Sequence, residues 1–218
     1  EQGLIDEATM ARAVERLLLA LGVRPEILVG HSAGAALALR LALDGEVEPE
    51  IVVGLNAALL PYGGVLAGLF QPLARLFAAA PLLADSLAAR ARGAGTVERL
   101  IESTGSRLPA EAIADYRRVL GDPGHVSATL GMMAGWDLGP LLAELPELAV
   151  PLVLVVGDAD RTVSPEQAER IRRRLPSARV VRLARLGHLA HEEDPRRLAE
   201  VIGECLDTES SGDSPAWS

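Results

Sequence analysis

Gly30-His31-Ser32-Ala33-Gly34 is the stretch that decides the fold. A short apolar run, residues 27–29, precedes it, and a helix-forming run, residues 35–43, follows it. Its five residues fit the pattern G-x-S-x-G, and a strand before that pattern with a helix after it is the context of a sharp strand-to-helix turn. Such a turn exposes the Ser32 hydroxyl at a helix N-terminus, whose dipole favours a developing negative charge. The sequence therefore predicts that Ser32 is a nucleophile, that Gly30, His31 and Gly34 shape its turn, and that the Ala33 N–H binds an oxyanion.

Strands and helices alternate on both sides of this turn. Buried strands are predicted over residues 27–29, 50–55, 151–156 and 179–183, each from a short apolar run. Amphipathic helices are predicted over residues 7–21, 35–43, 166–175 and 195–206, and Gly22 and Gly45 are expected to end the first two. This alternation predicts an α/β fold, with a mostly parallel sheet that is covered by helices on both faces.

A long helix-like region separates the second and third strands. Residues 57–145 are rich in Ala and Leu and are too many for a simple crossover, so we expect an inserted helical cap. Ligands bind at the carboxyl edge of such sheets, and the cap is expected to cover that edge. The predicted organisation is a core from residues 1–56 and 146–206, a cap at 57–145, and a disordered tail at 207–218 that is rich in Ser, Asp, Glu, Gly and Pro.

Two later loops carry residues that would activate a serine. Asp160 follows the strand at 151–156, and His188 follows the strand at 179–183, so both belong to the same sheet edge as Ser32. A serine hydroxyl becomes a good nucleophile when an imidazole takes its proton, and a carboxylate orients that imidazole. The order Ser32, Asp160, His188 therefore predicts a catalytic triad. Asp158 is the alternative acid, with a turn hydrogen bond as its other explanation; His191 is the alternative base, or a loop residue near the entrance.

Composition excludes several classes of function. The 218 residues are 49% hydrophobic and 23% charged, which fits one globular domain, and the formal net charge of -9 disfavours nucleic acid. The longest uncharged stretch, residues 51–74, contains Pro61, Gly63 and Gly64, so no transmembrane segment is expected. The single Cys205 excludes an internal disulfide and fits a reducing compartment. Nucleotide and flavin motifs are absent from the sequence, and we expect no cofactor and no metal site.

The motifs and their order resemble the α/β-hydrolase fold. That fold commonly has eight strands and takes a second oxyanion N–H from a loop after an early strand. This sequence has about four strands, and residues 1–21 already form the helix before the Ser32 strand. We therefore expect the early strands of the fold, with that second donor, to be missing from this chain.

Several segments narrow the resemblance to one family. Residues 30–40, 54–58, 61–64, 105–107, 122–126 and 130–137 are similar to the BchO-type magnesium-chelatase accessory proteins of bacteriochlorophyll biosynthesis, and the resemblance runs from about residue 11 to residue 206. Gly54-Leu-Asn-Ala-Ala58 and the Gly-Met-Met-Ala-Gly-Trp-Asp segment, residues 131–137, carry most of the discrimination. The resemblance implies a role near magnesium insertion in photosynthesis, in a cytoplasmic protein, with a peripheral position at the photosynthetic membrane as an open alternative.

These segments also supply candidate substrate-binding residues, namely Asn56, His125, Met133 and Trp136. Core packing remains the alternative for Met133 and Trp136, and an ordinary hydrogen bond remains the alternative for His125, which has no second ligand at metal spacing. Two functions follow. One is a serine hydrolase, such as an esterase or thioesterase, that acts on a small hydrophobic substrate. The other is a non-catalytic accessory protein that binds a tetrapyrrole or magnesium chelatase subunits.

Overall fold

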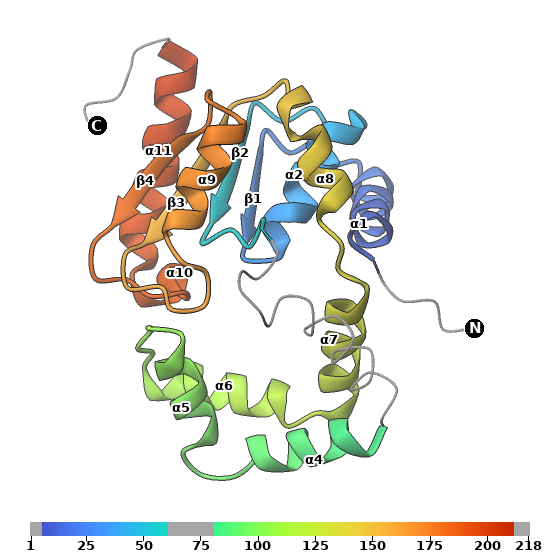
Figure 1. Ribbon diagram of the computed structural model, residues 1–218, viewed down its shortest axis with the longest axis vertical. Coiled ribbons are helices and arrows are strands. Elements are labelled where there is room, and N and C mark those ends of the chain that lie inside the picture. The colour runs from blue at the N-terminus through green and yellow to red at the C-terminus, as the bar shows by residue number, and fades with distance from the viewer. Residues whose placement is uncertain (1–5, 61–80, 212–218) are drawn as a thin grey trace.

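Four parallel strands form the centre of the computed structural model, which describes residues 6–60 and 81–211 (Figure 1). Their spatial order is β1-β2-β3-β4. The strands are β1 (Ile27–His31), β2 (Ile51–Leu55), β3 (Leu152–Gly157) and β4 (Arg179–Leu183). Each pair is in parallel register, for example Val53 opposite Val153. The predicted parallel sheet is confirmed, with strand bounds that differ from the expected ones by at most two residues.

Helices connect and cover these strands, and α1 and α2 end at glycines that provide a left-handed cap. The helices are α1 (Glu7–Leu21), α2 (Gly34–Asp44), α4 (Pro81–Ala91), α5 (Thr96–Ser103), α6 (Ala110–Leu120), α7 (Pro123–Gly135), α8 (Gly139–Glu144), the 3-10 helix η1 (Leu145–Glu147), α9 (Glu166–Arg174), α10 (Ala190–Glu193) and α11 (Pro195–Ser211). Helix α1 shows both kinds of cap: the Asp6 carboxylate accepts the Thr9 N–H at 2.7 Å, and Gly22 ends the helix at φ 63°.

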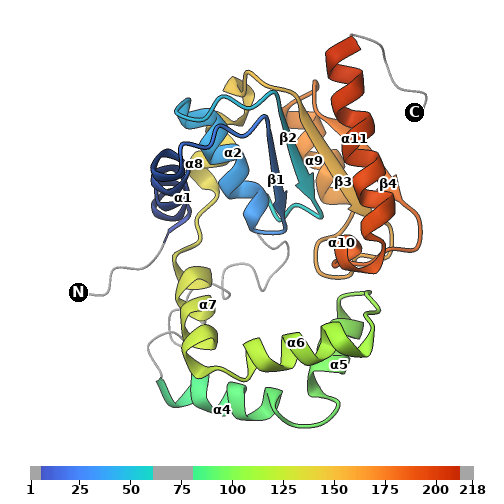
Figure 2. The same ribbon diagram turned by 180° about the vertical axis from the view of Figure 1, so that it is seen from behind.

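Alternate residues of the strands face two different helical layers. Val53 and Val155 point to one side, where Cys205 of α11 packs against them. Val52 and Leu154 point to the other side, against α1, α2, α8 and α9. Figures 1 and 2 show α11 alone on its face of the sheet, opposite α2 and α9. Both faces of the two central strands, β2 and β3, are thus buried, which is why these strands read as continuous apolar runs. In the edge strand β1, Val29 remains 46% exposed.

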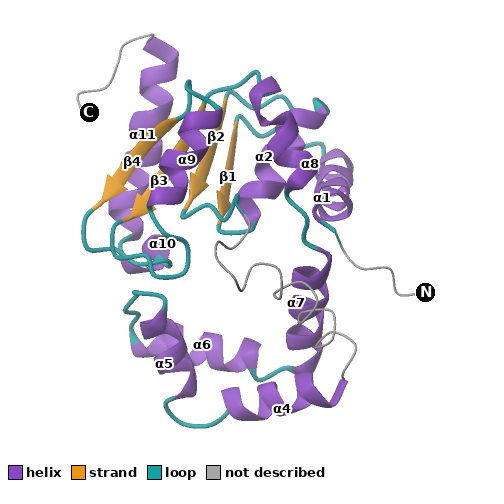
Figure 3. Ribbon diagram, in the orientation of Figure 1, coloured by secondary structure: helices purple, strands orange, loops and turns teal. Residues whose placement is uncertain are grey.

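Helices α4 to α7 form a separate layer beyond the carboxyl ends of the strands (Figure 3). A small core of their own, which includes Val97 and Ile101, also takes in Leu189 from the loop after β4. Helix α8 behaves differently, because Leu141 and Leu142 belong to the main core and α8 contacts α2. This packing favours a cap that ends near residue 135 rather than at the expected boundary of 145.

Two other expectations concern the chain's less regular segments. Helix α11 continues to Ser211, so residues 207–211 are helical where the sequence predicted a disordered tail, and residues 212–218 lie outside the described residues. The part of the expected cap at residues 61–80 also lies outside them. None of the described helices combines the length and the apolar character needed to cross a bilayer.

Candidate active site

The turn after β1 holds Ser32 in an unusual backbone conformation. Ser32 has φ 52°, a region that residues with a Cβ seldom occupy. Its N–H donates to the Leu55 carbonyl at 2.9 Å, and its carbonyl accepts the N–H groups of Ala35 and Ala58. Gly30 has to be glycine, because a Cβ there would lie 2.4 Å from the Gly34 carbonyl oxygen. Neighbouring backbone groups thus hold the strained turn, as G-x-S-x-G between a strand and a helix predicts.

His188 and Asp160 approach Ser32 from the loops after β4 and β3. The Ser32 hydroxyl lies 3.1 Å from His188 Nε2, and His188 Nδ1 lies 2.8 Å from Asp160 Oδ2. Both partners are buried, at 7% and 6% exposure. The other Asp160 oxygen accepts the N–H groups of Thr162 and Val163, at 2.7 and 2.9 Å, which fixes the carboxylate plane. The structure brings together the three residues that the sequence selected.

The Ala33 N–H is placed to act on the same reaction. Ala33 is the N-cap residue of α2, and within the described part of the chain its N–H donates to no other group. A free N–H next to the nucleophile, at the end of a helix where the dipole is positive, can stabilise an oxyanion. The geometry therefore leaves one oxyanion donor available beside Ser32.

His31 supports His188 from the other side. The His31 Nε2–H donates to the His188 carbonyl at 2.9 Å, and the His31 ring lies 4.8 Å from the His188 ring and 4.3 Å from the His191 ring. Burial lowers the pKa of His31 to about 4, and the hydrogen bond to His188 opposes that shift only in part. His31 is therefore neutral at pH 7 and adds no second positive charge beside the His188 imidazole.

We expect His31 to make the folded state sensitive to acid. Because its pKa is about 4 in the folded state against an ordinary 6.5, the unfolded chain binds the proton first as the pH falls. The contribution of His31 to the free energy of unfolding is fully present above pH 6.5 and is lost as the pH falls toward 4. The total loss is at most about 3 kcal/mol. Urea unfolding at several pH values measures this, with His31→Gln as the control, because glutamine keeps an N–H donor and does not titrate. If the free energy of unfolding changes equally with pH in the wild type and in His31→Gln, the expectation is contradicted.

Asn56 corrects one of the sequence-based expectations. It is 2% exposed, too buried to be the substrate-binding residue that the sequence suggested. Its amide nitrogen donates to the carbonyls of Gly187 and His188, at 2.9 and 2.8 Å, and its amide oxygen accepts the Gly157 N–H at 2.8 Å. Asn56 thus ties the end of β3 to the loop that carries His188, and it does so at φ 44°, which Asn tolerates better than most residues.

Removing this amide should damage stability and activity together. Asn56→Ala leaves two carbonyls and one N–H buried without their partner, which we expect to lower the free energy of unfolding by about 2–4 kcal/mol. Because the His188 backbone loses a support, the rate of any reaction at Ser32 should fall as well. Urea unfolding and an ester-hydrolysis assay measure the two effects. A variant that stays within about 0.5 kcal/mol of the wild type would remove Asn56 from this role.

Residues 104–107 of the cap form hydrogen bonds with the loops that carry Asp160 and His188. The sequence did not predict these contacts. The Thr104 carbonyl accepts the N–H groups of Arg161 and His188, at 3.1 and 3.3 Å. Ser106 is fully buried, and its hydroxyl accepts the Leu189 N–H at 2.8 Å. The Glu193 carboxylate bridges the N–H groups of Gly187 and Arg107. The one sequence clue was the segment Gly105-Ser106-Arg107, which stood out as a family match without a suggested role.

The remaining candidates lie elsewhere. His125 is exposed on α7, Met133 is half-buried on the same helix, and Trp136 packs against the main core; their part in substrate binding stays a prediction. Asp158, the alternative acid, accepts the Arg185 N–H across to the next loop. His191, the alternative base, has its ring against His31. In the described ranges, 6–60 and 81–211, no group of His, Cys, Asp and Glu gathers to hold a metal ion.

Comparison with known proteins agrees with this geometry. Residues 3–201 match the Alpha/beta hydrolase family. The chain is 38% identical over 198 residues to the magnesium-chelatase 30 kDa subunit of Rhodobacter capsulatus, across 91% of this chain and 69% of that protein. It is 29% identical over 206 residues to epoxide hydrolase EphH of Mycobacterium tuberculosis, across 91% and 94% of the two chains.

Among solved structures, the malate-bound thermophilic esterase of Thermogutta terrifontis superposes with a TM-score of 0.68 at 25% identity, covering 95% of this chain and 74% of that one. The fold, the motif order and the family match agree with one another. The chain belongs to the alpha/beta hydrolase family.

Proposed function

We propose that this protein is a serine hydrolase that cleaves a small hydrophobic ester or thioester through an acyl-enzyme. The observation that carries the proposal is the pair of hydrogen bonds from Ser32 to His188 and from His188 to Asp160, at 3.1 and 2.8 Å. Two such hydrogen bonds in series convert an unreactive hydroxyl into a nucleophile. A Ser at position 32 also disfavours chemistry that forms its ester intermediate on an enzyme carboxylate.

The steps follow from the positions of the atoms. Ser32 Oγ attacks the substrate carbonyl carbon while its proton passes to His188 Nε2. The Asp160 carboxylate holds the Nδ1–H and stabilises the imidazolium. The Ala33 N–H and the start of α2 face the developing oxyanion. His188 then protonates the leaving group as its bond to the acyl carbon breaks. A water molecule next attacks the acyl carbon while its proton passes to His188, and His188 returns a proton to Ser32 Oγ as the bond between Ser32 and the acyl group breaks.

A panel of 4-nitrophenyl esters of increasing acyl length tests this proposal. The wild type should hydrolyse at least one of them, and Ser32→Ala should lower that rate to near the background reaction in water. Circular dichroism establishes that both proteins are folded. A folded wild type that is no faster than Ser32→Ala on every ester would contradict a hydrolase.

A second function is favoured by the relationship to the Rhodobacter capsulatus protein. On the strength of 38% identity to a magnesium-chelatase subunit, we propose that the chain also associates with magnesium chelatase and binds a tetrapyrrole, in the service of bacteriochlorophyll biosynthesis. Fluorescence titration with protoporphyrin IX tests the binding. Equal affinity in the wild type and Ser32→Ala would separate binding from hydrolysis, and absence of binding in both would contradict the tetrapyrrole part.

A further inference from the structure

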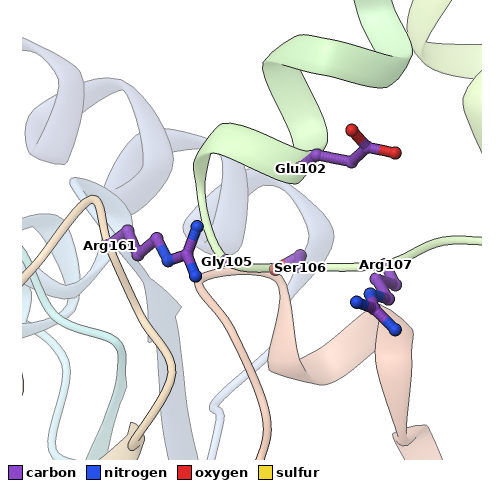
Figure 4. Close-up of a pocket in the computed structure, with 5 residues that line it drawn as sticks. All are labelled: Glu102, Gly105, Ser106, Arg107 and Arg161. Carbon is purple, nitrogen blue, oxygen red and sulfur yellow. The ribbon is translucent and has the colours of Figure 1, made fainter.

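A polar cleft of about 380 Å³ lies between the cap and the loop that follows β3, and the proposed hydrolysis makes no use of it (Figure 4). Its lining residues are Glu102, Gly105, Ser106, Arg107 and Arg161. We propose that this cleft is a binding site for a small dicarboxylate, whose two carboxylates are held by Arg107 and Arg161. The proposal does not depend on whether Ser32 is a nucleophile.

The two arginines have the chemistry and the freedom that such a ligand requires. They come from distant parts of the chain, one just after α5 and the other just after Asp160, and Figure 4 shows their side chains on either side of the Gly105–Ser106 backbone. Within the described residues, neither guanidinium is engaged in an ion pair or hydrogen bond. A guanidinium binds a carboxylate through two parallel N–H donors, so two separated guanidiniums suit two carboxylates.

Some arginines of the chain are neutralised by ion pairs. Arg40 lies 2.8 Å from Asp44 and 2.7 Å from Glu144, and Arg117 pairs with Glu98. The chain as a whole carries a formal charge of -9, which repels anions. Among the described residues that line the cleft, two arginines stand against one acidic residue, Glu102. A second carboxylate, that of Glu193, lies behind the lining and accepts the Arg107 backbone N–H at 3.1 Å.

The wall between the arginines is fixed in place. Gly105 has φ 87°, and a Cβ there would lie 2.0 Å from the Ala159 carbonyl oxygen, so cap and loop are in direct backbone contact. Hydrogen bonds from Arg161 N–H to the Thr104 carbonyl and from Leu189 N–H to the Ser106 hydroxyl lock this contact. A cleft whose walls are already held apart costs little entropy to organise around a ligand.

Calorimetric titration of succinate into Ser32→Ala protein tests the site, since that background removes any hydrolysis. We expect Arg107→Gln and Arg161→Gln each to weaken succinate binding about tenfold or more, because each loses a charge-assisted contact. Glu102→Gln should tighten binding severalfold, because it removes the acidic side chain that lines the cleft. Arg90→Gln is the matched control: it removes one exposed arginine from α4, which does not line the cleft, and should change the affinity less than twofold.

Several results would overturn the proposal. These are no succinate binding to a folded protein, equal weakening by Arg90→Gln and Arg107→Gln, or binding of acetate or inorganic phosphate as tight as that of succinate. Thermal unfolding establishes that each variant is folded. Should Arg161→Gln fail to fold, Arg107→Gln and Glu102→Gln still decide, because they must shift the affinity in opposite directions. A negative result for succinate binding says nothing about the reactivity of Ser32, so the dicarboxylate site and the serine hydrolase can each be rejected independently of the other.

Discussion

Replacing His188 by Ala lowers the rate of ester hydrolysis by about 10⁴- to 10⁶-fold. His188 Nε2 is the base that lies 3.1 Å from the Ser32 hydroxyl, and its removal takes away the group positioned to accept the Ser32 proton. The loss should appear in kcat, because the imidazole acts on the reacting atoms and not on distant parts of the substrate. Steady-state kinetics with the best 4-nitrophenyl ester measures it.

Arg90→Ala serves as the control, since it removes an exposed basic side chain from α4 that has no assigned part in the site. We expect the control to stay within a few-fold of the wild type in kcat. A His188→Ala protein that is folded and retains more than about a hundredth of the wild-type rate would contradict its role as the base.

Replacing Asp160 by Asn should lower kcat by about 10⁴-fold with little change in KM. The loop N–H groups of Thr162 and Val163 both point at one Asp160 oxygen, so the asparagine must turn its own oxygen toward them. Its NH₂ group then faces His188 Nδ1 and donates to it, which forces the imidazole proton onto Nε2. With a proton on Nε2, His188 cannot accept the proton of Ser32.

The pH dependence of kcat provides a second readout for the Asp160→Asn variant. A wrong tautomer depresses the rate across the neutral range, and the activity should recover in part at high pH, where hydroxide replaces the missing base. The matched variant is Asp158→Asn, on the same loop, whose carboxylate accepts only the Arg185 N–H among the described residues. We expect it to keep most of the activity; equal losses in the two variants would point to loop damage in place of triad chemistry.

The order of strands and helices and the triad residues Ser32, Asp160 and His188 could be predicted from the sequence, because both depend on local sequence patterns. Apolar runs mark the strands, and Ser32, Asp160 and His188 each follow the end of one of them. Parallel strands bring all their carboxyl ends to one edge, so position in the sequence fixes position in space. The predicted end of α1 at Gly22 was correct for a similar reason, since glycine alone readily takes the left-handed conformation there.

Contacts between distant segments could not be predicted in this way. Asn56 was a candidate ligand contact because it lies in a segment that matches the resembled family, and its amide instead satisfies the backbone of two other loops. Ser106 lies in a family-matching cap segment that suggested no role, and its hydroxyl accepts the Leu189 N–H from 83 residues away in sequence. The sequence alone does not show on which side of the cap boundary α8 belongs, because α8 continues the helical pattern of the cap while its leucines pack in the main core.

The most direct test of an activated Ser32 is covalent labelling with a fluorophosphonate probe, in the wild type beside Ser32→Ala. An activated hydroxyl attacks the phosphorus atom, whereas ordinary surface serines do not react. We predict labelling of the wild type, complete loss of labelling in Ser32→Ala, and a peptide adduct that maps to Ser32 by mass spectrometry. A folded wild type that remains unlabelled, or a label that persists in Ser32→Ala, would contradict the account.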